Sequence, residues 1–147
     1  ATVIAHEIGH VVSNHHDERI TRQLGAQTAL GIGGALLGSR VGAGAAQTAG
    51  QLGGALLQST FLLPGSRQQE SEADVVGQRL MAEAGFNPEQ SVALWENMIA
   101  ASGSRTPEWL STHPDPRARI GELRSRASGL MPVYQQARAA GRRPACG

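Results

Sequence analysis

The sequence predicts a mainly α-helical fold, and three observations support this prediction. Apolar residues recur at helical spacing in several segments, which favours amphipathic helices. Asn, Ser and Pro residues stand where such helices would begin, and Gly residues stand where they would end. No segment alternates apolar and polar residues as a half-buried strand would. The chain has 147 residues, enough for one domain with a substantial core.

The first predicted helix contains the strongest chemical signal, the stretch His6-Glu7-Ile8-Gly9-His10. Residues i and i+4 share a helix face, so His6 and His10 can bind one metal ion, and Zn²⁺ suits such nitrogen ligands. Glu7 lies about 100° around the helix from His6. It can hold a water at the open coordination position and take its proton during attack on a carbonyl. An exposed helix with two ordinary histidines is the alternative, and the apolar residues on both sides of the motif argue against it.

A catalytic zinc site normally has three protein ligands, and the chain offers two candidates for the third. The first is His16, at the last position of the longer pattern H-E-x-x-H-x-x-G-x-x-H. That pattern belongs to metzincins, in which the glycine ends the helix. Because Ser13 stands at the glycine position, we expect the helix to continue through Asn14. His16 would then lie about 240° from His10, and both His15 and His16 would face solvent.

The second candidate is Glu70, which is followed four residues later by Asp74. Both carboxylates share a helix face, so one can bind the metal while the other accepts the N–H of a ligating histidine. The spacing alone leaves open which of the two carboxylates takes which role. Glu72 is expected to face water. Gly77 continues the Glu70 face by one more turn, where its missing side chain would let another helix approach closely.

The segment between the two ligand helices, residues 25–65, is rich in glycine and alanine and carries a single charge, Arg40. A short unit occurs twice in it, at residues 33–37 and 53–57. The segment is predicted to be a pair of closely packed antiparallel helices joined near residues 38–44. Two alternatives stay open, a flexible lid and a membrane span over residues 41–63, which has the roughly 20 uncharged residues needed. Glutamines and glycines make that span only weakly hydrophobic.

Start and stop signals define the later helices. Ser66 is expected to cap the second ligand helix, which would run to Ala84 and end at Gly85. Asn87 and Pro88 predict the next helix, as N-cap and first helical residue, ending near Gly103.

Two further proline signals follow, at Thr106-Pro107 and Asp115-Pro116. Between them His113 precedes Pro114 and is expected in an extended loop, because a residue before proline avoids the helical region. A final helix is expected over residues 130–140, and residues 141–147 form a tail.

Taken together, these motifs resemble one protein family. The stretch from His6 to His10, followed by Ser-Arg-x-x-Glu-x-Glu-Ala-Asp-x-x-Gly at residues 66–77, is similar to HtpX-like and CAAX-prenyl-protease-like zinc metallopeptidases, the forty-eighth metallopeptidase family. Residues 80–88, the stretch 111–114 and the pair Arg119-Ile120 also resemble it. The resemblance covers residues 1 to about 125 and is greatest to the soluble or lipid-anchored periplasmic branch.

The resemblance implies a gluzincin, with one zinc ion on His6, His10 and Glu70. Glu7 would be the base and Asp74 would support a ligand. It also implies that His113 lies near the metal and steadies the oxyanion.

The same resemblance implies a zincin-like helical core from which the family's upstream β-strands are absent, since the chain starts just before the catalytic helix. We therefore expect a fragment or processed part of a longer protein, and no signal sequence can be read. A periplasmic location in the bacterial cell envelope and a role in protein quality control are implied as well.

These observations predict a single metallopeptidase domain over residues 1–140, with residues 25–65 inserted between the ligand helices. Its predicted function is zinc-dependent endopeptidase activity on unfolded or extended polypeptides. Two alternatives stay open, a non-catalytic zinc-stabilised helical module that binds a partner and a metzincin-like peptidase that uses His16. Glu7 favours catalysis, because a structural zinc site has four protein ligands and needs no base.

Composition limits the possible partners. The net charge is +1 and aromatic residues make up 3% of the chain, so neither long-range attraction nor a stacking platform for nucleic acid is expected. Seven of the thirteen arginines follow Pro116. They could contact anionic lipid peripherally, although solvated helix faces are favoured. Cys146 is the single cysteine and cannot form an internal disulfide.

Overall fold

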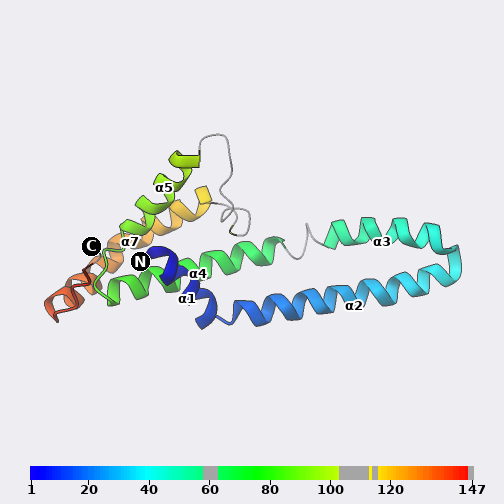
Figure 1. Ribbon diagram of the computed structural model, residues 1–147, viewed down its shortest axis with the longest axis horizontal. Helices are drawn as coiled ribbons and strands as arrows, with labels where there is room; N and C mark the ends of the chain where they lie inside the picture. The colour runs from blue at the N-terminus through cyan, green and yellow to red at the C-terminus, as the bar shows by residue number, and fades with distance from the viewer. Residues whose placement is uncertain (58–62, 103–112, 114–115, 146–147) are drawn as a thin grey trace. The chain divides into compact units, whose positions relative to one another are not determined.

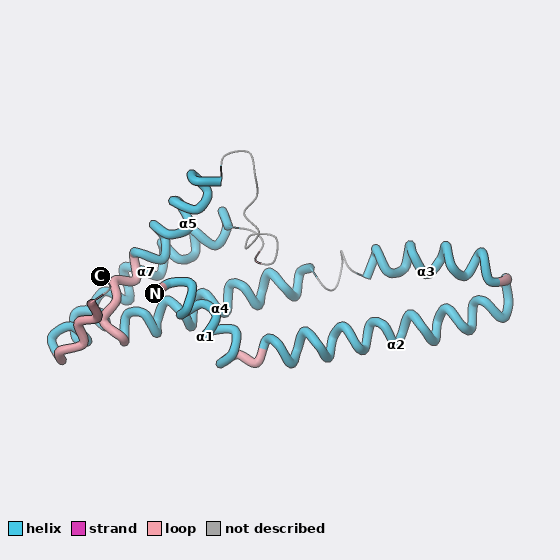
Figure 2. Tube along the Cα trace, viewed as in Figure 1, coloured by secondary structure: helices cyan, strands magenta, loops and turns pink. Residues whose placement is uncertain are grey.

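The computed structural model describes residues 1–57, 63–102, 113 and 116–145. Over these residues the chain is helical and has no strand, which confirms the mainly α prediction (Figure 2). The helices, labelled in Figure 1, are α1 (Thr2–Val12), α2 (His15–Val41), α3 (Ala43–Leu57), α4 (Leu63–Glu83), α5 (Gln90–Ser102) and α7 (Pro116–Ala139). The chain divides into two compact units. Unit 1 consists of Ala1–Ser13 and Gln69–Gly147, and unit 2 is Asn14–Gln68.

In unit 1, helix α1 and the part of α4 beyond Gln69 touch backbone to backbone. A Cβ atom added to Gly77 would lie 2.7 Å from the carbonyl oxygen of Ala5, and one added to Gly9 would lie 2.4 Å from that of Ala73. No real side chain fits at such distances. The close approach predicted at Gly77 is therefore confirmed, and Gly9 provides a second, unforeseen contact of the same kind.

Helix α1 ends earlier than expected. Its last residue is Val12, and Asn14 adopts the left-handed conformation at φ 55° before α2 begins at His15. The prediction that the helix continues through Asn14 was wrong, because asparagine enters the left-handed region more readily than other non-glycine residues. His15 is buried, contrary to expectation, whereas His16 is exposed as expected.

The hydrophobic core cluster of unit 1 lies between α5 and α7. Trp95 and Leu123 are each 1% exposed and pack with Val92, Met98 and Ile120. Gln78 of α4 donates hydrogen bonds from Nε2 to the Leu123 carbonyl at 2.9 Å and to Ser91 Oγ at 3.0 Å. This buried amide therefore ties the second ligand helix to both of the helices that follow it.

The second ligand helix, α4, begins at Leu63, three residues before the predicted cap Ser66. Pro64 is compatible with this start, since the first amide groups of a helix have no helical partner. Helix α4 ends at Glu83, one residue before the predicted last residue, Ala84. Gly85 has φ 84°, and the Phe86 amide donates to the Met81 carbonyl at 2.9 Å, a Schellman arrangement.

Helix α7 begins at its predicted proline signal, whereas α5 begins at Gln90, two residues after Pro88, the predicted first helical residue. Asn87 Oδ1 accepts a hydrogen bond from the Glu89 amide at 2.9 Å, so Asn87 caps the turn that leads into α5. Helix α7 begins at Pro116 and runs without a break to Ala139, with Pro132 inside it. The separate final helix expected from residue 130 is thus the second half of α7. The signal at residues 106–107 lies outside the described residues.

Unit 2 contains α2 and α3, joined at Gly42, which has φ 87°. Small residues bring the two helices together: a Cβ atom added to Gly38 would lie 3.6 Å from Ala46 Cβ. The predicted extent of the insertion and the single-domain organisation stay predictions. Among the described residues, no helix combines the length and hydropathy required to cross a membrane.

Candidate metal centre

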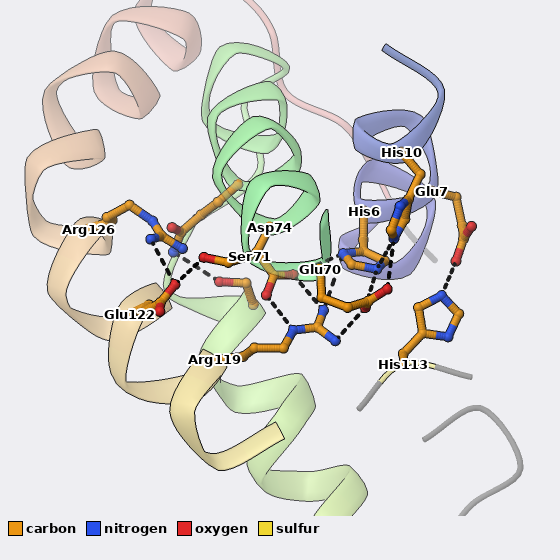
Figure 3. A network of polar contacts seen from close by, with 12 residues as sticks. His6, Glu7, His10, Glu70, Ser71, Asp74, His113, Arg119, Glu122 and Arg126 are labelled. Atoms are coloured by element: carbon orange, nitrogen blue, oxygen red, sulfur yellow. Dashed lines mark hydrogen bonds and ion pairs between the residues drawn. The ribbon is translucent and has the colours of Figure 1, made fainter. Parts of the chain in front are cut away.

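Four side chains that can ligate a metal converge in unit 1. His6 and His10 of α1, Glu70 of α4 and His113 each offer a ligand atom, and these atoms all lie within 4.8 Å of one another (Figure 3). His6 Nε2 and His10 Nε2 lie 3.1 Å apart, and Glu70 Oε1 lies 3.2 Å from His10 Nε2. His6, His10 and Glu70 are at most 8% exposed. The predicted ligands are therefore brought together although sixty positions separate His10 from Glu70.

The donor set fits a zinc ion. Two imidazoles and one carboxylate are the ligands of a common class of catalytic zinc sites. His6 Nδ1 lies 2.9 Å from Asp74 Oδ1, and an ionised carboxylate only accepts hydrogen bonds. The proton of neutral His6 is therefore on Nδ1, and the lone pair on Nε2 points toward His10 and Glu70. Asp74 thus lies at the ring nitrogen of His6 that is opposite to Nε2.

Electrostatics keeps the two carboxylates ionised. Burial alone would raise the pKa of Glu70, but hydrogen bonds with His10 and His6 outweigh it and lower that pKa to about 2. Burial opposes ionisation of Asp74 too, yet its hydrogen bonds with Arg119 and His6 lower its pKa. Burial disfavours protonated His6, but its bonds to Asp74 and Glu70 raise its pKa above 6.5. A metal and a proton therefore compete for His6, so metal binding is coupled to pH.

Arg119 is a residue of this centre to which the sequence analysis gave no role. It is 3% exposed, and its guanidinium carbon lies 4.3 Å from the ring centre of Trp95. It donates from Nη1 to Glu70 Oε2 at 2.7 Å. It also donates to both oxygens of Asp74, at 2.6 and 2.8 Å. Two buried carboxylates require a compensating cation, so the sequence could have predicted that a basic residue joins them. It could not have predicted which of the thirteen arginines does so.

Glu7 and His113 lie next to the metal ligands. Glu7 is 46% exposed, and its Oε1 lies 3.4 Å from His113 Nε2. The His113 ring centre is 5.3 Å from that of His6 and 5.8 Å from that of His10. The centre therefore has an exposed carboxylate, Glu7, in addition to the buried network of Asp74 and Arg119.

The remaining candidates lie elsewhere. Glu72 is exposed on α4, as expected. His16 belongs to unit 2, and it is not a member of the donor group found among the described residues.

Comparisons with known proteins show the family to which the chain belongs. The family model of peptidase family M48 matches residues 1–127. The mitochondrial metalloendopeptidase OMA1 of Schizosaccharomyces pombe is 36% identical over 125 residues, which are 84% of this chain and 34% of that protein. The beta-barrel assembly-enhancing protease of Escherichia coli K12 is 33% identical over 144 residues, 92% of this chain and 28% of that protein. No solved structure matches the chain.

The family match includes all three predicted ligands, His6, His10 and Glu70. The chain belongs to peptidase family M48. It spans about a third of the length of these relatives, 34% and 28%.

Proposed function

We propose that this chain carries the active site of a zinc-dependent endopeptidase that hydrolyses peptide bonds in unfolded or extended protein segments. The observation that carries the proposal is the convergence of the buried ligands His6, His10 and Glu70 beside the half-exposed Glu7. Membership of a metallopeptidase family supports it.

Each residue has a role that follows from its position. His6, His10 and Glu70 would hold the zinc ion, which supplies Lewis acidity that polarises a carbonyl and acidifies water. Glu7 accepts a proton from the attacking water on Oε1 and delivers it to the leaving amine. His113 donates a hydrogen bond from Nε2 to the substrate oxygen on which charge develops. Asp74 keeps His6 in the tautomer that leaves Nε2 available.

The location of the whole protein is part of the proposal. The relatives include a mitochondrial enzyme and a bacterial protease whose name refers to β-barrel assembly. For this chain we propose the bacterial cell envelope, in the periplasm, and a role in protein quality control. The similarity to the Escherichia coli protease over 92% of the chain supports this choice.

The decisive variant is Glu7→Gln, which keeps the size of the side chain and removes the base. It should still bind one zinc ion, while hydrolysis of an unfolded protein such as reduced casein falls by about 10²–10⁴-fold. Glu72→Gln, which changes an exposed carboxylate of α4, is the matched control and should leave both properties unchanged. Undiminished hydrolysis by Glu7→Gln would show that another group is the base.

A non-catalytic zinc module is the second candidate, and one observation favours it. His113 joins the donor group, and four protein ligands would close the site as in a structural zinc centre. The same experiment separates the two functions. A closed structural site would bind zinc in both the wild type and Glu7→Gln, and neither would show hydrolysis that a chelator abolishes.

A further inference from the structure

We propose that Arg119 is a positioning residue that holds one oxygen of Glu70, so that Glu70 binds the metal through its other oxygen only. The inference rests on the proposed ligand set of His6, His10 and Glu70. It adds a residue to that site and states how the carboxylate must bind.

The two oxygens of Glu70 have different partners. Oε2 accepts a hydrogen bond from Arg119 Nη1 at 2.7 Å, and it lies 3.4 Å from His6 Nε2. Oε1 lies 3.2 Å from His10 Nε2. A charge-assisted bond from guanidinium occupies Oε2, and its positive charge disfavours a second cation on that side. Oε1 is therefore the oxygen that remains available to the metal.

Arg119 itself is held in place by several contacts, and Figure 3 shows those with Glu70 and Asp74. Its Nε and Nη2 donate to Asp74 Oδ2 and Oδ1, which is the paired geometry that matches a guanidinium to a carboxylate. Its plane lies against Trp95 of α5, 4.3 Å from the ring centre. Glu70 and Asp74 are one turn apart on α4, so a single guanidinium fixes both carboxylates relative to each other.

A lysine could not perform this task. Its ammonium group is a compact charge without a planar fork, so it cannot donate to Glu70 and to both oxygens of Asp74 in this geometry. Lysine would still compensate the buried negative charge. Arg119→Lys therefore separates the positioning role from simple neutralisation of charge.

The experiment uses Co²⁺ in place of zinc, because its visible absorption reports ligand set and coordination number. Arg119→Lys and Arg119→Gln should bind Co²⁺ about 10–100-fold more weakly than the wild type, the usual effect of removing a residue that supports a ligand. Their absorption should also become weaker, because Glu70 can then bind with both oxygens and raise the coordination number. Arg117→Gln, two residues earlier on α7 and exposed, is the matched control and should leave affinity and spectrum unchanged.

The possible outcomes are distinct. A folded Arg119→Lys chain with the affinity and spectrum of the wild type would overturn the proposal. So would weaker binding with an unchanged spectrum, since Arg119 would then support the fold without orienting Glu70. If Arg119→Gln does not fold, Arg119→Lys decides by the same criteria. A wild type that binds no Co²⁺ would instead refute the metal centre on which the proposed function depends.

Discussion

Asp74 accepts hydrogen bonds from two different helices. On one side His6 Nδ1 of α1 is 2.9 Å from Oδ1, and on the other Arg119 Nε of α7 is 2.6 Å from Oδ2. A carboxylate in this position makes the far nitrogen of the imidazole a better metal ligand, because it stabilises the positive charge that develops on the ring. Glu70, one turn earlier, lies beside the ligand nitrogens themselves.

Replacing these two carboxylates should therefore have unequal effects. Asp74→Asn keeps the shape of the side chain but weakens its hold on His6, so zinc affinity and peptidase activity should fall by about 10–100-fold without vanishing. Glu70→Gln removes a ligand and should abolish nearly all of both. Zinc affinity is measured by competition with a chelator, alongside hydrolysis, with Glu72→Gln as control. Equal losses in the two variants would mean that the roles are misassigned.

The two ligand helices are in contact through glycine. Gly9 of α1 faces the Ala73 backbone of α4, and Gly77 of α4 faces the Ala5 backbone of α1. His6 follows Ala5, and Asp74 follows Ala73, so the ligands and their support lie next to the contact points. The helix separation thus determines whether the Glu70 carboxylate reaches both histidines.

A methyl group at this crossing should disturb stability and metal binding together. Gly77→Ala must push α1 away from α4, and overpacking of this kind costs about 1–3 kcal/mol. The expected result is a lower Tm, measured by thermal unfolding, and a lower zinc affinity, measured by zinc titration. The matched control is Gly121→Ala on α7, where an added Cβ meets nothing within 4 Å. If Gly77→Ala bound zinc like the wild type, the crossing would not set the ligand geometry.

Across the whole chain, the sequence predicted the features that depend on residues close together along the chain. Spacing of four residues paired His6 with His10 and Glu70 with Asp74, and local signals located the cap at Asn87. It did not assign a role to Arg119, which reaches Asp74 from 45 positions away through the packing of α7. Gly9 was missed for the same reason, since its function depends on which backbone faces it.

Local signals also failed where neighbouring residues favour different positions for the end or the start of a helix. Ser13 indicated a continuing helix, but the next residue, Asn14, could take a left-handed conformation and ended it. Ser66 resembled an N-cap, but nothing in its own chemistry prevents the helix from starting one turn earlier at Leu63.

The metal-free chain should become less stable at acidic pH because the buried carboxylates become protonated. Glu70 has a pKa of about 2 in the folded chain and 4.5 as its ordinary value, so its contribution is complete above pH 4.5 and is lost as the pH falls toward 2. The free energy of unfolding, measured by urea titration, should therefore fall between these values. Glu70→Gln should show a flatter profile over the same range. Parallel profiles would indicate that other groups cause the acid sensitivity.

Unit 1 is built from two separate stretches of the chain, residues 1–13 and the residues from Gln69 on. Gly42, which joins α2 to α3, lies in unit 2 between them. A chain cleaved at Gly42 would become two polypeptides, with His6, Glu7 and His10 on one and Glu70 on the other. The proposed zinc site would then require the two to associate, and the cleaved protein would behave as a heterodimer whose metal affinity depends on its own concentration.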